Sequence, residues 1–208
     1  MCGISRNVSG FDVIRSFRKQ YAGSYYNAFV QKVRPLEARY LSVASLPDYR
    51  STGEKLFPSA NWDLGISRYK QNLMLFRNGI LTLVIGNEIL GYLSLWPVTK
   101  NFRDGFMSGE NSDDEFFPDK LFASEPQMAP AWYLTAVAIL PQDKRLRSQI
   151  RNRLINEIAS KFADNPQTEI FAEAETDSGN RFLRRLGFLF PVLNKPKLCV
   201  LSREVFKK

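Results

Sequence analysis

WYLTAVAILPQDKRLRSQIRNRLINEIASKFADNPQTEIFAEAETDSGNRFLRRLGF, residues 132–188, is the stretch that decides the fold. The apolar run over 132–140, bounded by Pro141, is typical of a strand buried on both faces. One helical stripe follows, made of Ile150, Leu154, Ile155, Ile158, Ala159 and Phe162. A second strand is predicted over 168–176 and a short helix over 179–188. Because strand, helix and strand in this order form a crossover, the two strands are predicted to be parallel neighbours.

The segment between the first strand and the helix is basic. It carries Lys144, Arg145, Arg147, Arg151 and Arg153. Cations at the N-terminus of a helix oppose its macrodipole and cost stability, unless an anion sits there. The sequence therefore predicts an anion-binding corner after Pro141.

The composition excludes several kinds of site. The chain has 208 residues, enough for one sizeable core, and 29 basic against 21 acidic residues give a net charge of +8. This excess favours phosphorylated ligands, nucleic acid or an acidic partner, or it serves solubility alone. The chain has no histidine, which removes Ser–His and Cys–His catalysis and argues against the common zinc sites. No metal site is predicted.

The cysteine count and the hydropathy pattern bear on the compartment. Cys2 and Cys199 are too few and too far apart for a disulfide framework, which fits a reducing compartment. No apolar run approaches the roughly 20 residues that span a bilayer, and the start of the chain lacks the apolar core of a signal peptide. We expect a cytoplasmic protein that does not enter a membrane.

The remaining sequence predicts further elements around this unit. Helices are predicted within 11–33, as part of an N-terminal extension over 1–36, and the region 37–208 is predicted to be a single globular domain. In that domain we expect a strand over 37–45, a loop or short helix over 47–60, and a helix capped by Asn61. Strands over 79–85 and 89–96 form a hairpin, which Pro97 is expected to stop. An irregular insertion over 97–131 is expected to fold over a cleft, although a solvated loop without a role fits the same length. A last strand is predicted within 197–206.

This order of elements resembles the GNAT superfamily of acyl-CoA-dependent N-acyltransferases, over roughly residues 37–206. The matching motifs are Ile139-Leu140-Pro141 after the central strand, Leu154-Ile155 as the leucine pair of the helix, and Arg185-Leu186-Gly187-Phe188 as the closing element. The resemblance implies an α/β (α+β) fold with a mixed central sheet flanked by helices. Extra N-terminal helices would precede it.

The resemblance also implies a cofactor, acetyl-CoA or another acyl-CoA. Its pyrophosphate would lie on the start of the helix, and its pantetheine arm would pair with the central strand through the backbone of Val137 and Ile139. A gap between the parallel strands would admit the thioester. The cofactor-binding residues implied are Val137, Ile139, Lys144, Arg145, Arg147, Ser148, Gln149, Ile150, Arg151, Asn152 and Asn180.

The sequence departs from the family pattern at two places. Gln149-Ile150-Arg151 stands where the family has Gly-x-Gly, so either Arg and Lys side chains replace the backbone amides or cofactor binding has been lost. Leu183 stands where the family usually has the tyrosine that protonates the leaving thiolate, which leaves water for this task.

Three residues are candidates for proton transfer. Glu173 and Glu175 share one face of the predicted strand, where a buried carboxylate would have a raised pKa and accept a proton near neutrality. Alternatively, both lie at the outer end of the strand and pair with Arg181 or Arg184. Tyr133 is a candidate acid, or an ordinary core aromatic residue.

Three functions are compatible with these observations. The first is an N-acyltransferase in which a primary amine of a small molecule or protein attacks acyl-CoA directly. The second is a catalytically silent GNAT-like module that binds CoA or a carrier protein bearing phosphopantetheine. The third is a nucleic-acid-associated protein using the cations at 144–153 and 181–185, but no known DNA-reading module is present, so nucleic acid is not an expected partner. The acidic stretch 110–115 is a weak indication of a cationic amine as acceptor. A homodimer is left open.

Overall fold

The computed structural model describes residues 35–56, 61–141, 143–190 and 196–202. Within them a six-stranded sheet has the order β1-β2-β3-β4-β5-β6, with β4 and β5 parallel and all other neighbours antiparallel. The strands are β1 (Glu37–Tyr40), β2 (Ile80–Ile85), β3 (Glu88–Val98), β4 (Ala131–Ile139), β5 (Glu169–Glu173) and β6 (Leu198–Ser202). The helices are α3 (Leu46–Leu56), α4 (Trp62–Leu75), α5 (Lys100–Ser108), α6 (Lys144–Asp164) and α7 (Asp177–Arg185).

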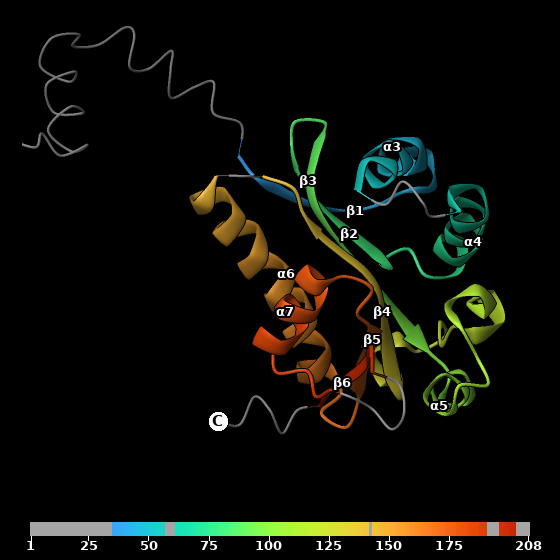
Figure 1. Ribbon diagram of the computed structural model, residues 1–208. Coiled ribbons are helices and arrows are strands. Elements are labelled where there is room, and N and C mark those ends of the chain that lie inside the picture. The colour runs from blue at the N-terminus through green and yellow to red at the C-terminus, as the bar shows by residue number, and fades with distance from the viewer. Residues whose placement is uncertain (1–34, 57–60, 142, 191–195, 203–208) are drawn as a thin grey trace, which may run out of the picture. The chain divides into compact units, whose positions relative to one another are not determined.

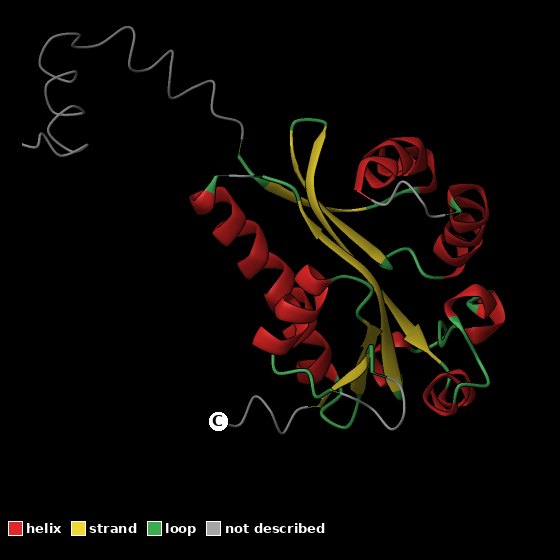
Figure 2. Ribbon diagram, viewed as in Figure 1, coloured by secondary structure: helices red, strands yellow, loops and turns green. Residues whose placement is uncertain are grey.

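Helices cover both faces of the sheet. In Figure 1, α6 and α7 lie on one side of it, and α3, α4 and α5 lie on the other. Figure 2 shows the same arrangement as a layer of strands between two layers of helices. The predicted mixed sheet flanked by helices is therefore confirmed. The predicted N-terminal helices lie outside the described residues and stay a prediction.

Strand β3 runs past the proline that was expected to end it. Pro97 pairs with Trp132 of β4, and its carbonyl oxygen accepts a hydrogen bond of 3.0 Å from the Phe122 amide on the opposite side. Because the nitrogen and carbonyl of one strand residue point the same way, the missing N–H of Pro97 faces away from β4 and costs the ladder nothing. Residues 120–122 run along this end of β3, with a bridge between Val98 and Leu121.

Strand β4 contains a bulge and then loses its neighbour. Ser94 is opposite Ala136 and Leu95 is opposite Leu134, so Thr135 is an extra residue without a partner in β3. On its other edge β4 pairs with β5 only over 131–134, although β4 continues to Ile139. The carboxyl ends of the two parallel strands therefore separate.

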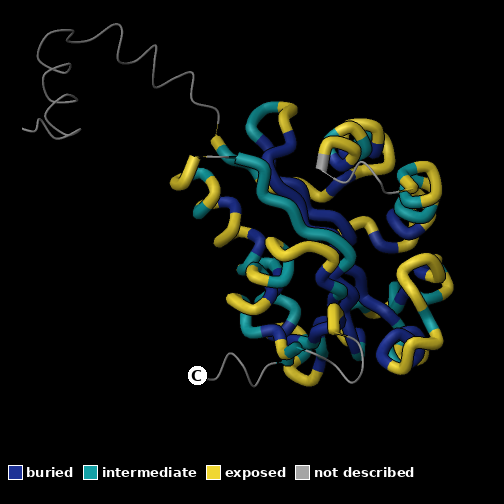
Figure 3. Tube along the Cα trace, in the orientation of Figure 1, coloured by how far each residue is buried: buried dark blue, intermediate teal, exposed yellow. Residues whose placement is uncertain are grey.

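This separation corrects the prediction that the strand over 132–140 is buried on both faces. Residues 131–134 are buried, whereas residues 135–139 are only partly buried (Figure 3). The second half of β4 lacks the cover that a paired β5 would give. An apolar sequence is therefore left at the rim of a gap.

Helix α6 begins earlier than predicted. Asp143 is its N-cap, and the Asp143 carboxylate accepts a hydrogen bond of 2.8 Å from the Leu146 amide. The predicted basic loop is therefore the first two turns of the helix. Behind it Ile150, Leu154, Ile158 and Phe162 form the buried stripe, and Gly91 lets the helix approach β3, because a Cβ at Gly91 would lie 2.7 Å from Cγ2 of Ile150.

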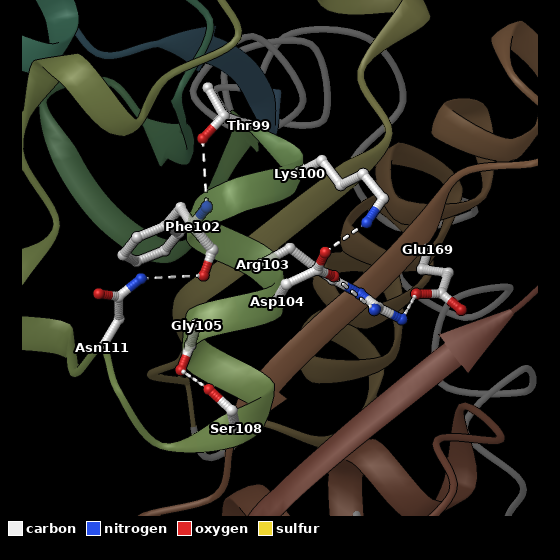
Figure 4. Close-up of polar contacts among 9 residues, drawn as sticks. All are labelled: Thr99, Lys100, Phe102, Arg103, Asp104, Gly105, Ser108, Asn111 and Glu169. Atoms are coloured by element: carbon white, nitrogen blue, oxygen red, sulfur yellow. Dashed lines mark hydrogen bonds and ion pairs between the residues drawn. The ribbon is translucent and has the colours of Figure 1, made fainter.

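The insertion over 97–131 is more regular than expected. Thr99 caps α5 through a hydrogen bond of 3.3 Å from the Phe102 amide, and Arg103 of α5 forms an ion pair with Glu169 of β5 (Figure 4). The Phe102, Phe106, Phe116 and Leu121 side chains of this segment are buried. Apolar burial thus orders the segment, and it is not a solvated loop.

Several predicted boundaries were too long or too loose. The strand predicted over 37–45 ends at Tyr40, and the strand predicted over 168–176 spans only Glu169–Glu173. The region 47–60, predicted as loop or short helix, contains most of α3. The predicted cap is confirmed, since the Asn61 side chain accepts a hydrogen bond of 3.2 Å from the Leu64 amide. The hairpin and the last strand are confirmed as β2–β3 and β6.

Candidate functional site

A cavity of about 490 Å³ lies where β4 and β5 separate. We call it the strand gap. Its β4 wall is Leu134–Val137, and its other wall is Ala172–Thr176 with Gly179 and Leu183 of α7. On the side of α3 and α4 it is lined by Tyr49, Trp62, Tyr69 and Tyr92.

A second cavity, of about 670 Å³, lies between α6 and α7. We call it the basic groove. Its residues are spaced three or four apart on each helix, so that two helical faces oppose each other. They are Lys144, Arg147, Ser148, Arg151, Asn152 and Ile155 of α6, together with Ser178, Arg181, Phe182, Arg185 and Leu186 at α7, and Ile139 of β4.

The basic groove concentrates positive charge. Lys144, Arg147, Arg151, Arg181 and Arg185 line it, and among the described residues none of them has a carboxylate within 4.0 Å. Within the described ranges, the Arg181 side chain donates only to the Ser178 hydroxyl, at 3.3 Å, and that of Arg151 lies 3.5 Å from the Ser148 hydroxyl. Clustered cations without anions repel one another, so this groove is suited to a multiply charged anion.

Side chains, rather than backbone amides, are available to such an anion. Gln149, Ile150 and Arg151 lie inside α6, where their amides bond within the helix. At the helix start, the Asp143 carboxylate already occupies the Leu146 amide. The glycine-rich cradle that the sequence lacks is therefore absent in geometry too, and the side chains that line the groove, with the guanidinium groups foremost, are the donors available to an anion.

Tyrosines form the floor of the strand gap toward α3 and α4. The Tyr49 and Tyr92 rings are 4.9 Å apart, and those of Tyr49 and Tyr69 are 5.8 Å apart. Tyr92 is 0% exposed, and its hydroxyl has no hydrogen-bond partner among the described residues. Burial, with the neighbouring Tyr69, raises the pKa of Tyr92, which keeps this hydroxyl protonated at neutral pH.

The two predicted carboxylates both line the strand gap but differ in surroundings. Glu173 ends β5, is partly buried, and has no ion-pair or hydrogen-bond partner for its carboxylate among the described residues. The Glu175 side chain is 64% exposed and pairs with Lys197 at 2.8 Å. Glu175 therefore lacks the burial on which its prediction depended, and it pairs with neither Arg181 nor Arg184.

Tyr133 is a core residue. It is 3% exposed, its ring stacks on Phe171 at 4.9 Å, and its hydroxyl donates to the Asp113 carboxylate at 2.9 Å. Burial, and then Asp113, raise its pKa well above the ordinary value. The Asp113 side chain is 55% exposed, yet its partial burial against the protein raises the pKa of this carboxyl group too. The Tyr133 hydroxyl thus uses its proton in the hydrogen bond to Asp113, and Tyr133 does not line the strand gap.

The structure brings most of the predicted cofactor residues together. Val137 lines the strand gap, and the basic groove collects Ile139, Lys144, Arg147, Ser148, Arg151 and Asn152. Arg145, Gln149, Ile150 and Asn180 line neither cavity. Ile150 is 0% exposed in the core, and the Asn180 side chain accepts a hydrogen bond of 2.7 Å from Arg184 on its own helix.

Sequence analysis missed the contribution of α7 and of β3 to this site. Arg181 was considered only for an ion pair or for nucleic acid, and Arg185 only for nucleic acid and as part of the closing motif, although their spacing of four residues already placed them on one helical face. Tyr92 carried no signal in the sequence, because an aromatic residue in a strand usually indicates a core.

The described residues contain no group of three or more Cys, Asp or Glu side chains arranged to hold a metal ion. Within the same part of the chain, every helix is too short or too polar to traverse a bilayer.

Comparisons with known proteins bear on the fold. No family model matches the sequence, and a search of curated proteins finds no match. Among solved structures, the loading GNATL domain of CurA from Lyngbya majuscula has 15% identity and a TM-score of 0.58, covering 84% of this chain and 100% of that domain. A polyamine N-acetyltransferase of Drosophila melanogaster, which forms N-acetylagmatine, has 11% identity and a TM-score of 0.54, covering 81% and 100%. A GNAT family acetyltransferase from Brucella melitensis, solved with acetyl-CoA, has 13% identity and a TM-score of 0.49, covering 81% and 88%.

Proposed function

The chain has the GNAT fold, and on this premise we propose that it is an N-acyltransferase that transfers an acetyl or other acyl group from acyl-CoA to a primary amine. One observation carries the proposal: β4 borders both the strand gap, at Val137, and the basic groove, at Ile139. Two residues of a strand span about 6.6 Å. A ligand with an anionic head and an extended, uncharged arm can therefore use both cavities at once.

The residues of the groove would hold the phosphates. Arg147 and Arg151 reach in from α6, and Arg181 and Arg185 from α7. Guanidinium groups bind phosphate oxygens through charge-assisted hydrogen bonds, which replace the amides of a glycine-rich loop. Ser148 and Asn152 add neutral donors to the same wall.

The free edge of β4 would hold the arm. Past Leu134 the backbone of β4 has no partner in β5, so its N–H and C=O groups are open to pairing. Thr135, the bulge residue, has no partner in β3 and lines the strand gap, so its backbone is a further candidate donor there. A donor at this point would stabilise negative charge on a carbonyl oxygen.

Acyl-CoA, when bound, supplies the thioester whose carbonyl carbon gains a bond to the amine nitrogen as the carbon–sulfur bond breaks. Glu173, which has no cation partner, would accept the proton that the nitrogen loses. Leu183 provides no proton, so the departing sulfur takes its proton from water. The proton held by Glu173 then neutralises the hydroxide that this water leaves, so the products are an amide and a free thiol.

A catalytically silent module that binds CoA or a carrier-borne phosphopantetheine is the second candidate. The observation that favours it is the apolar Leu183 in the strand gap. Leu183 offers no proton to a leaving thiolate, but it leaves binding in the groove intact.

A titration with acetyl-CoA tests the proposal. Thermal unfolding of the full chain should shift upward with the logarithm of acetyl-CoA concentration above its dissociation constant. Thiol release should then follow on addition of primary amines. The absence of any shift with acetyl-CoA contradicts the proposal, and a shift without thiol release over a broad amine panel favours the silent module. A protein acceptor, a homodimer and a cytoplasmic location remain predictions.

A further inference from the structure

The strand gap has an acidic side that the acyl donor does not use. Glu173 and Glu175 line the gap, and no described cation does. The negative charge extends further, because Asp113 acts electrostatically on Glu175 and on Tyr69. A ligand arriving on this side meets carboxylates, in contrast to the five cations of the basic groove.

Two cations near the acidic side of the gap already form ion pairs with carboxylates. Arg68 of α4 donates to the Asp113 backbone carbonyl, and its guanidinium lies 3.9 Å from the Asp113 carboxylate and 3.8 Å from that of Asp114. Lys197 pairs with Glu175. Against these two cations stand four carboxylates, those of Asp113, Asp114, Glu173 and Glu175. The excess is negative, and Glu173 is the carboxylate without a partner of its own among the described residues.

The hydroxyl of Tyr92 is an independent sign of a ligand. Tyr92 lines the strand gap, and its hydroxyl is fully buried and has no hydrogen-bond partner in the described part of the protein. Leaving a buried hydroxyl unpaired costs free energy that a bound polar group recovers. The phenol oxygen accepts hydrogen bonds, and an ammonium or amine N–H is a donor that the neighbouring carboxylates also attract.

We infer that the acceptor side of the strand gap binds an aliphatic amine of net positive charge, with Glu173 and the Tyr92 hydroxyl as its contacts. This rests on the proposed function. An acceptor with its own carboxylate, such as an amino acid, would face Glu173 with like charge and is disfavoured. The charge of the acceptor, rather than its length, is the property that the site selects.

Three compounds of matched length test the inference: 1,4-diaminobutane, butylamine and 4-aminobutyrate. Each is titrated calorimetrically into the full chain saturated with CoA, which has no acyl group to transfer. We expect the diamine to bind at least about fivefold more tightly than butylamine, and 4-aminobutyrate to bind most weakly. These differences in affinity should become smaller when the salt concentration is raised from about 50 to about 300 mM, because salt screens the interaction between charges. Equal affinities, tighter binding of 4-aminobutyrate, or no binding of any of the three overturns the inference.

Variants assign the contacts. Glu173→Gln should abolish the preference for the diamine, whereas Glu125→Gln, an exposed carboxylate that lines neither cavity, should leave it intact. Tyr92→Phe should weaken diamine binding about tenfold while raising the unfolding midpoint of the free protein, because it removes the unpaired hydroxyl. Unchanged diamine affinity in Tyr92→Phe would exclude that contact.

The same titrations on the CoA-free protein separate this inference from the proposed function. If the protein binds the diamine by charge but does not bind CoA, the transferase proposal is contradicted and the site for a cationic amine is retained. If the protein binds CoA but binds the diamine more weakly than the other two compounds, the proposed function is retained and the inference is contradicted.

Discussion

The basic groove and the acidic side of the strand gap border the same strand but differ in charge and in the way they were built. Five cations from two helices line the groove, without a partner carboxylate among the described residues. The gap owes its shape to β4 and β5 parting after Leu134, and it presents Glu173 and Glu175 beside buried tyrosines. The proposed transfer brings a polyanion and an amine together, and opposite potentials at neighbouring positions of β4 favour binding of each ligand in its own cavity.

Loss of charge across the groove should give the largest effect. Arg151→Ala combined with Arg181→Ala removes one guanidinium from each wall and should weaken CoA binding about 100-fold, since each charge-assisted hydrogen bond contributes about 1.5 kcal/mol. Calorimetric titration measures the change. The matched control is Arg145→Ala with Arg153→Ala, which removes the same charge from α6 outside the groove lining. An equal loss in both double variants would mean that net charge, not the groove, binds CoA.

Filling the strand gap should separate the two regions. Ala136 lines the gap, and a phenyl ring in Ala136→Phe would occupy the space needed by the arm. Binding of pantetheine and thiol release from acetyl-CoA should be lost, while adenosine 3′,5′-diphosphate should bind the groove as in the parent protein. Ala136→Gly, which leaves the gap open, is the control. Full pantetheine binding by the Phe variant would show that the arm lies elsewhere.

Removal of the Tyr133 hydroxyl should give the smallest effect. Tyr133→Phe deletes the hydrogen bond to Asp113 and should lower the free energy of unfolding by about 1 kcal/mol. Binding of acetyl-CoA should be unchanged, because the hydroxyl faces Asp113 and not the gap. Denaturant unfolding and calorimetry measure the two quantities. A tenfold fall in thiol release at unchanged stability would restore Tyr133 as an acid.

The sequence was sufficient for the order of elements along the chain, for the parallel pair and the hairpin, and for the location of positive charge, because these depend on local pattern. The crossover followed from an apolar run, a helical stripe and a second apolar run. The basic corner followed from Lys144, Arg147 and Arg151. The start of α6 was predicted too late because Asp143 was not considered as an N-cap. With Asp143 as the cap, accepting a hydrogen bond from the Leu146 amide, the helix begins two turns earlier.

Features that depend on tertiary pairing were not predictable in the same way. The alignment of Gln149-Ile150-Arg151 with the family's Gly-x-Gly predicted that Ile150 contacts the cofactor. Its position in the apolar stripe instead puts it in the core, against Gly91. The extra residue at Thr135 is defined only by the register with β3. The unpaired hydroxyl of Tyr92 depends on what surrounds it, and nothing in its sequence neighbours indicates this.

The passage of β3 through Pro97 has a consequence for solubility. Beyond Leu95, whose amide still donates to the Gly79 carbonyl, β3 extends past the start of β2, and unpaired strand backbone of this kind can add a strand from another molecule. Here the proline offers no N–H, and its carbonyl is already taken by Phe122, while the Thr99 amide is taken by the Lys120 carbonyl. The insertion that carries Asp113 to the acidic side thereby also covers the end of β3 against the addition of a foreign strand.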